Sequence, residues 1–301
     1  MMSAVLLNAT LAGGLTVVSR RPNPWASTFP SEILTCVCGD RVSEVLVKFS
    51  GGGGHPAFGH RSGVSYEAAV YREVLHATPL PSPSFLGACE TPSDMGLMIE
   101  YLGEGAGVDE HPSPHDAMRA AAHWIGAFHA WWDHHPAPSW LRCYDEGYYV
   151  QWARRTSELA GDWHRRLPWL APLCEAAVLI AAEMAAYPFT VIHGEFTPSN
   201  ILIKDGLIKP VDWESCARGL GEIDLVSLTE GWPEETCAAC REEYQGARWA
   251  GDPPAEYQRR LHLAWLYWHL RWLGEREDWL SNGVLKRADH LREIGKRLAI
   301  L

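Results

Sequence analysis

Two short segments in the second half of the chain carry the residue types best suited to chemistry. The first reads His193-Gly194-Glu195-Phe196-Thr197-Pro198-Ser199-Asn200-Ile201-Leu202, and the second, ten residues further on, reads Asp212-Trp213-Glu214. The apolar strands expected on either side predict a buried scaffold rather than a surface loop with solvated acids. Phosphoryl transfer needs an acid that orients or deprotonates a hydroxyl, and oxygen ligands that hold Mg²⁺ against phosphates. Two carboxylates and a carboxamide in this arrangement therefore predict a phosphotransferase.

These segments resemble the catalytic and metal-binding loops of the aminoglycoside phosphotransferase family, which is related to choline kinases and protein kinases. The family pattern is H-G-D-x-x-x-x-N, followed by a hydrophobic residue, Asp and then Trp or Phe. His193, Gly194, Asn200 and Asp212 match it directly. The resemblance implies ATP and Mg²⁺ as cofactors, Asn200 and Asp212 as metal ligands, and His193 and Asn200 as catalytic-loop residues.

Glu195 departs from the family, because it stands where the catalytic Asp is usual. Its extra methylene moves the carboxylate about an ångström further out. Glu195 is either a working base on a longer arm or the mark of a weakened or lost activity. We favour the working base, because Glu can supply both reach and basicity and both metal ligands are retained.

Lys48 closes the apolar run Val45-Leu46-Val47 and is expected to bind the α- and β-phosphates. The downstream helical pattern offers two acids as its partner. Glu67 shares a face with Val70, Tyr71 and Val74, whereas Glu73 shares one with Ala69 and Ala77. We choose Glu67 and keep Glu73 in reserve.

Two further segments are candidates for nucleotide binding. The loop 22–30 lacks G-x-G-x-x-G, but Ser27 and Thr28 can present hydroxyls and backbone N–H groups to phosphates; a plain turn before a strand is the alternative. The run 95–102 leads into a Gly-rich hinge. There Glu100 and Leu102 are expected to read the adenine edge through their main chains, and Tyr101 to line the site.

Four residues outside these segments are expected to have structural roles. Asp224, in Gly219-Leu-Gly-Glu-Ile-Asp224-Leu, is expected to cap the next helix and to brace the catalytic loop. His129, His134 and His135, near the end of a Trp-rich helix, are expected to serve in capping.

The patterns predict an α+β fold of two lobes, protein-kinase-like by resemblance. The hairpin 31–50 with its Gly39-Asp40 turn, a helix over 66–75 and strands over 84–89 and 95–102 give a small antiparallel lobe. Longer helical patterns follow, interrupted by short strands. They cover 117–132, 149–167 and 172–186, and helices resume near 225. We expect a nucleotide-binding lobe over 1–102 and a helical lobe with the catalytic loop, metal site and acceptor pocket over 103–301.

Composition and sequence pattern argue against several classes of protein. The net charge of −11 argues against a nucleic-acid-binding protein. The sequence contains no uninterrupted apolar stretch of about 18 residues, so that no membrane span is expected. The first apolar run has no basic residues before it, which argues against a secretory signal. The eight scattered cysteines predict reduced thiols in the cytoplasm, and the protein is expected to be a monomer or homodimer.

The sequence leaves three hypotheses about the function open. The first is O-phosphorylation of a small molecule, in particular a cationic antibiotic (antibiotic resistance) or metabolite. Acids of the tail would bind its ammonium groups, unless they form a solvated face: Glu234, Glu235, Glu242, Glu243, Glu275, Glu277 and Asp278. The second is a kinase for Ser or Thr of a peptide in natural-product biosynthesis, and the third is a silent nucleotide-binding pseudokinase. The choice between ATP and GTP stays open as well.

Overall fold

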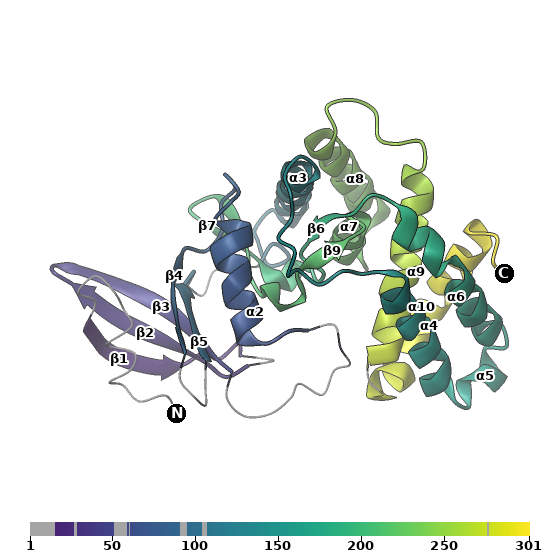
Figure 1. Ribbon diagram of the computed structural model, residues 1–301, viewed down its shortest axis with the longest axis horizontal. Coiled ribbons are helices and arrows are strands. Elements are labelled where there is room, and N and C mark those ends of the chain that lie inside the picture. Colours follow the sequence, from purple (N-terminus) through teal and green to yellow (C-terminus); the bar gives the residue numbers. More distant parts are fainter. Residues whose placement is uncertain are drawn as a thin grey trace. The chain divides into compact units, whose positions relative to one another are not determined.

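The computed structural model describes residues 16–26, 29–50, 59, 61–90, 95–103, 107–275 and 277–301 (Figure 1). The chain divides into two compact units. Unit 1 is formed by Met1–His55, Gly59–His111 and Ser199–Ser215, and unit 2 by Pro56–Phe58, Pro112–Pro198 and Cys216–Leu301. The lobe boundary at residue 102 stays a prediction.

Unit 1 contains an antiparallel sheet of five strands in the order β1-β2-β3-β5-β4. The strands are β1 (Thr16–Pro22), β2 (Ser31–Cys38), β3 (Arg41–Phe49), β4 (Phe85–Glu90) and β5 (Met95–Glu100). The predicted β2–β3 hairpin is confirmed, and its register pairs Cys38 with Arg41 across the Gly39-Asp40 turn. Gly39 has φ +57°, a conformation that glycine adopts without strain.

Strand β3 presents two different faces. Val45, Val47 and Phe49 are buried in a core with residues from three other strands: Leu34, Cys36, Cys89 and Met98. Because side chains alternate along a strand, Leu46 and Lys48 point to the opposite face. The apolar alternation therefore fixes the face to which Lys48 belongs.

A helix and a second hairpin complete unit 1. The predicted helix is confirmed, as α2 (Val64–Ala69) continued by a π-helical segment η1 (Val70–Leu75). Strands β7 (Ile201–Lys204) and β8 (Leu207–Pro210) pair around an Asp205-Gly206 turn, and η3 (Trp213–Ser215) follows. Both turn residues have positive φ, 53° and 74°, as a tight two-residue hairpin requires.

Unit 2 is mainly helical. Its helices are α3 (Pro114–Asp133), α4 (Glu146–Ala160), α5 (Trp163–Arg166), α6 (Leu170–Ala186), α7 (Glu222–Thr229), α8 (Glu234–Arg248), α9 (Tyr257–Glu275) and α10 (Glu277–Arg297). Strands β6 (Thr190–Ile192) and β9 (Ala217–Gly219) form a short antiparallel pair. The prediction of one helix over 149–167 is wrong, because the chain leaves the helix at Gly161, with φ +47°, before α5 begins.

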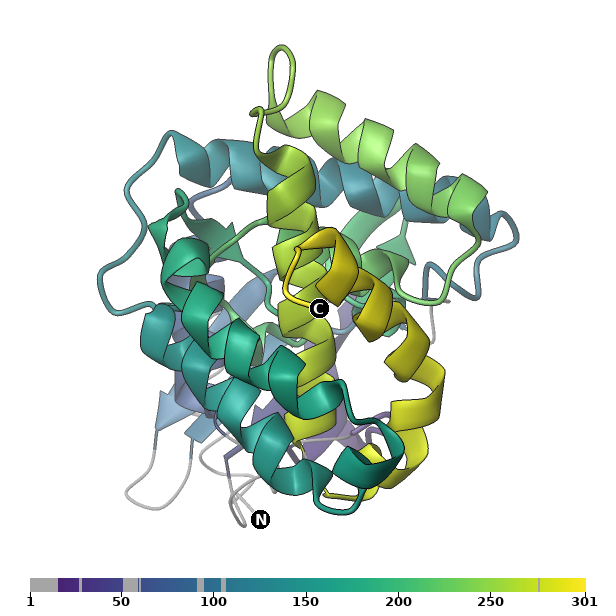
Figure 2. The same cartoon turned by 90° about the vertical axis from the view of Figure 1, so that its right-hand side faces the viewer.

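Helices α3 and α8 lie side by side, and α4 packs against α6 and α9 (Figure 2). The approach of α3 to α8 depends on Gly126, since a Cβ there would lie 2.6 Å from the carbonyl oxygen of Tyr244.

Among the described residues, no helix has both the length and the apolar character needed to cross a membrane. No disulfide joins the seven cysteines whose side chains are described.

Candidate active site

Lys48 joins two carboxylates of unit 1. Its Nζ lies 3.0 Å from each carboxylate oxygen of Glu67 and also donates to Oδ1 of Asp212. Glu67 lies on α2 and is 0% exposed. The reserve candidate, Glu73, bonds instead to its exposed neighbour Arg72. The structure therefore pairs Lys48 with Glu67, and a role of this pair in binding nucleotide stays a prediction.

The buried groups of this cluster shift the pKa values of one another. Although burial opposes its charge, Asp212 and Glu67 hold the pKa of Lys48 well above its usual value. Burial raises the pKa of Glu67, against the attraction of Lys48. Burial also raises the pKa of the nearby Glu214 to about 8. Lys48 thus stays protonated and offers a fixed positive charge.

The backbone holds Asp212 in an unusual conformation. Its φ is +62°, a region that non-glycine residues seldom adopt and that often marks functional sites. On one side, Val211 N–H donates to the carbonyl of Asn200 at 2.9 Å. On the other, Trp213 N–H donates to Glu67 Oε1 at 3.3 Å, and its buried indole bonds to the carbonyl of Pro210. These contacts tie the two predicted metal ligands to the same hairpin.

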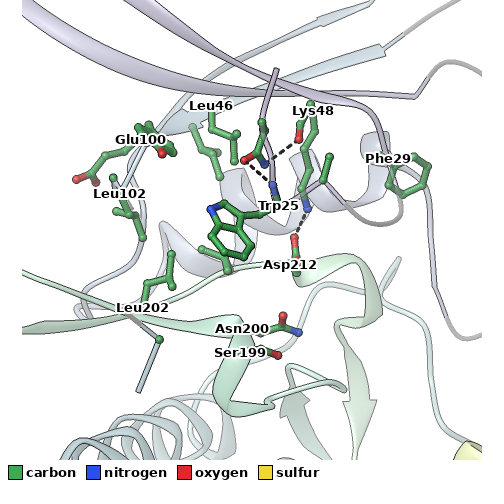
Figure 3. A pocket seen from close by; sticks show the side chains of 18 of the residues that line it. Trp25, Phe29, Leu46, Lys48, Glu100, Leu102, Ser199, Asn200, Leu202 and Asp212 are labelled. Carbon is green, nitrogen blue, oxygen red and sulfur yellow. Dashed lines mark hydrogen bonds and ion pairs between the residues drawn. The ribbon is translucent and has the colours of Figure 1, made fainter. Parts of the chain in front are cut away.

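A pocket of about 430 Å³ in unit 1 contains most of the predicted nucleotide-binding residues (Figure 3). Aliphatic residues form part of its wall: Leu46, Ile99, Leu102, Leu202 and Val211. Lys48, Asn200 and Asp212 supply polar groups, and Figure 3 shows Lys48 reaching Asp212. The combination of an apolar wall and a few polar groups is typical of a small-molecule site.

The loop between β1 and β2 contributes a residue that the sequence reading missed. Ser27 and Thr28 lie outside the described residues. Trp25, which is 74% exposed, lines the pocket with Phe29. Asn23 shapes this loop, since its Oδ1 accepts from Trp25 N–H and its Nδ2 donates to Ser31 Oγ. The available signal in the sequence was a Trp that ends the Pro-rich run Pro22-Asn23-Pro24-Trp25.

The three predicted hinge residues also line the pocket. Glu100 N–H donates to the carbonyl of Ser84, and Tyr101 N–H donates to that of Glu44. The Glu100 carboxylate accepts from Lys209 at 2.8 Å, and this bond and the Ser84 N–H lower its pKa although burial opposes this. Within the described part of the chain, the main chain of Leu102 forms no hydrogen bond. Leu102 is therefore the hinge position whose main chain is most available to a ligand.

In unit 2, Asp224 braces the loop that carries Glu195. Its two carboxylate oxygens accept from the backbone N–H groups of His193 at 2.7 Å and Gly194 at 2.8 Å. The predicted bracing role is thus confirmed. The predicted capping role is wrong, because Asp224 lies in the first turn of α7, whose N-cap residue is Gly221.

His129 has a different role from the predicted one. Its Nε2 lies 3.1 Å from Asp224 Oδ2 and its Nδ1 lies 3.0 Å from the hydroxyl of Tyr244. The ring is fully buried, and burial lowers its pKa. The prediction of helix capping is wrong for His129, because a buried imidazole between two polar partners supports the brace instead. It is confirmed for His134, the C-cap residue of α3, and for His135, whose Nδ1 lies 2.7 Å from the carbonyl oxygen of Trp131.

Glu195 is only 7% exposed, and its main chain is fixed locally. Its N–H donates to His193 Nδ1 at 3.3 Å, and its carbonyl accepts from Thr197 N–H at 2.7 Å. Its carboxylate accepts a hydrogen bond from Arg271 of α9. The sequence reading missed Arg271, whose only signal was a basic residue within a Trp-rich helix.

Several of the acids suggested for binding cations are paired with arginines. Glu234 pairs with Arg241 and Glu243 with Arg119, and Glu275 lies 3.6 Å from Arg271. The side chains of Glu277 and Asp278 lie outside the described residues.

Comparisons with known proteins bear on the family and the fold of this chain. Residues 40–261 match the family described as phosphotransferase enzyme family. A search of curated proteins finds no match. Among solved structures, the chain is similar to a choline kinase from Cryptosporidium parvum, with 13% identity, a TM-score of 0.63 and coverage of 96% of this chain and 92% of that chain.

Two other similar structures contain ligands. An aminoglycoside phosphotransferase from Streptomyces rimosus, in complex with ADP and streptomycin, is 20% identical, with a TM-score of 0.55 and coverage of 90% and 96%. Amicoumacin kinase hAmiN, in complex with AMP-PNP, Ca²⁺ and Ami, is 13% identical, with a TM-score of 0.57 and coverage of 98% and 90%. At these identities the likeness shows the protein-kinase-like fold, which confirms the predicted fold class.

The match over most of the chain also confirms the predicted family and a phosphotransferase that acts on a hydroxyl acceptor. The chain belongs to the phosphotransferase enzyme family.

Proposed function

We propose that this chain transfers the γ-phosphate of ATP to a hydroxyl group of a small molecule, an aminoglycoside-like or other cationic antibiotic or metabolite. The observation that carries the proposal is the cluster of Lys48, Glu67 and Asp212 at the pocket that Asn200 also lines. In the reaction, the acceptor oxygen forms a bond to the γ-phosphorus as the bond to the β,γ-bridging oxygen breaks.

In this proposal the pocket of unit 1 holds the nucleotide. The aliphatic wall of Leu46, Ile99 and Leu202 suits a purine. The main chain of Leu102, which bonds to no other described residue, can bond to the purine edge. Lys48, oriented by Glu67, contributes its positive charge to the α- and β-phosphates. The buried pair holds the ammonium group in one place before the nucleotide arrives.

The residues present suit Mg²⁺. Among the described side chains, no group of three His, Cys, Asp or Glu forms a metal cage. Mg²⁺ is typically bound in kinases by one or two side-chain oxygens together with substrate phosphates. Asn200 and Asp212 supply such oxygens, and Asp212 is presented by a constrained backbone. When bound, Mg²⁺ would neutralise phosphate charge.

We assign Glu195 the role of orienting the acceptor hydroxyl and accepting its proton. Phosphoryl transfer depends mainly on positioning and charge stabilisation, so that a well-placed carboxylate suffices. The braced loop of His193 and Gly194 supplies that placement. Retention of Lys48, Glu67, Asn200 and Asp212 supports an active enzyme over a silent pseudokinase.

A cationic acceptor is supported by the net charge of −11. The arginine partners of Glu234, Glu243 and Glu275 reduce the charge that these acids can offer. The exposed Glu235 and Glu242 of α8 are therefore the better candidates of this set.

The test is transfer from Mg·ATP to a panel containing streptomycin, choline and a Ser-containing peptide, with products identified by mass spectrometry. We expect phosphorylation of a cationic small molecule by the native protein and none by Asp212→Asn. If only the peptide is phosphorylated, the acceptor is a peptide and the proposed class of small-molecule acceptor is wrong. No consumption of ATP with any acceptor or with water would overturn the proposed function.

A further inference from the structure

We propose that Arg271 is a positioning residue that fixes the carboxylate of Glu195 in its working orientation. The inference rests on the proposed function, in which Glu195 orients the acceptor hydroxyl. It explains how a Glu with a longer side chain can take the place of the usual Asp.

The contact between Arg271 and Glu195 is buried within unit 2. Nη2 of Arg271 donates to Oε1 of Glu195, and the Arg271 side chain is 0% exposed. Glu275, one helical turn further along α9, lies 3.6 Å from the same Nη2. Although burial opposes its charge, Glu195 and Glu275 raise the pKa of Arg271, which keeps the guanidinium charged.

Aromatic rings hold the guanidinium in place. Its central carbon lies 5.0 Å from the ring centre of Trp268 and 5.7 Å from that of Trp272. Cation–π contacts of this kind are stronger where water is excluded. Trp268 and Trp272, which lie one turn apart on α9, thus orient the arginine.

The loop leaves Glu195 little freedom to adjust through its backbone. Asp224 fixes the preceding N–H groups, and Glu195 itself bonds to His193 and Thr197 through its main chain. A Glu side chain has one more rotatable bond than Asp, so that a fixed backbone alone does not define its carboxylate. Arg271 supplies the missing restraint, because a planar guanidinium prefers a defined geometry with a carboxylate.

The main experiment compares Arg271→Met with Arg260→Met. Arg260 is a matched control, since it is also buried on α9 and its Nη2 lies 2.9 Å from Glu222. The assay is turnover of Mg·ATP with water as the acceptor, repeated with any acceptor that the native protein phosphorylates. Mg·ATP affinity and Tm are measured alongside.

We expect both variants to lower Tm and only Arg271→Met to lower kcat, by roughly 10-fold or more, since small misplacements of a catalytic group are costly. The KM for ATP should stay the same. Arg271→Lys, which retains a charge, should recover part of kcat, and it provides the test if Arg271→Met does not fold. Equal kcat values in Arg271→Met and Arg260→Met, or native kcat in both Arg271 variants, would overturn the inference.

A double variant separates positioning from general damage. If Arg271 acts through Glu195, adding Arg271→Met to Glu195→Gln should cause no further fall in kcat. A further fall as large as that in the native background would overturn the inference while leaving the proposed function intact. An absence of any ATP turnover in the native protein would instead remove the proposed function, and this inference with it.

Discussion

Nζ of Lys48 lies 3.0 Å from both carboxylate oxygens of Glu67, a residue on a different element of unit 1. The two side chains are held by a sheet face and a helix face that the sequence pattern defines independently. The same ammonium group bonds to Asp212, so that one cation links the predicted phosphate and metal sites.

Lys48→Ala should raise the KM for ATP by roughly 10-fold or more, because a hydrogen bond to a charged group contributes about 1.5–3 kcal/mol. Tm should fall, since the buried Glu67 loses its cation, but the fold should be retained. Steady-state kinetics and circular dichroism measure both effects. Lys296→Ala, which removes an exposed pair with Glu293, is the control. An unchanged KM would show that Lys48 does not bind the nucleotide.

Much of unit 1 was predictable because its signals are local. Alternation places Val45 and Val47 in the core and Lys48 on the opposite face, and the glycine turn sets the hairpin register. Strand β1 was not predicted, because its side chains are largely exposed and show no apolar alternation. Strand β9 has only three residues, too few for a periodic signal.

Replacing two glycines by alanine should change the stability of the protein in different ways, because only Gly126 lies at the close approach of α3 to α8. Gly126→Ala should destabilise the protein by about 1–3 kcal/mol, because its Cβ would overlap the backbone of Tyr244 and the side chain of Ala247. Gly246→Ala, where the added Cβ meets nothing within 4 Å, should be neutral or stabilising by up to about 1 kcal/mol. Urea unfolding compares the two. Equal effects would contradict the close packing at Gly126.

A buried histidine predicts a pH effect on stability. Burial, with His290 and Arg287 nearby, holds the pKa of His269 well below its usual 6.5. The unfolded chain therefore binds a proton more readily, and the contribution of His269 to stability is complete above about pH 6.5 and is lost as pH falls below it.

His269→Phe isolates this contribution, since it keeps an aromatic ring beside Trp265 but cannot be protonated. The unfolding free energy of the native protein minus that of the variant should fall by about 1 kcal/mol between pH 7.5 and 5.5. Urea unfolding at the two pH values measures it. The same difference at both pH values would mean that His269 titrates normally in the folded protein.

The segment from His193 to Asn200 was predictable as a motif, but the side chains that support it were not. Asp224 could be proposed as a brace because the surrounding sequence resembles a known pattern. The partners His129 and Arg271 are 95 residues from Asp224 and 76 residues from Glu195, respectively. No local periodicity encodes such pairings, because they depend on how the helices pack. His129 was therefore predicted to be a capping residue, and Arg271 was missed.

The central claim is that Asp212 takes part in a Mg²⁺-dependent nucleotide site, and calorimetry tests it most directly. Asp109→Asn is the matched control, because Asp109 lines the same pocket and its change removes the same charge. We predict that the native protein and Asp109→Asn bind ATP more tightly with Mg²⁺ than with EDTA. Asp212→Asn should lose this Mg²⁺ dependence and bind at least roughly 10-fold more weakly. Native Mg·ATP affinity in a folded Asp212→Asn protein would contradict the account.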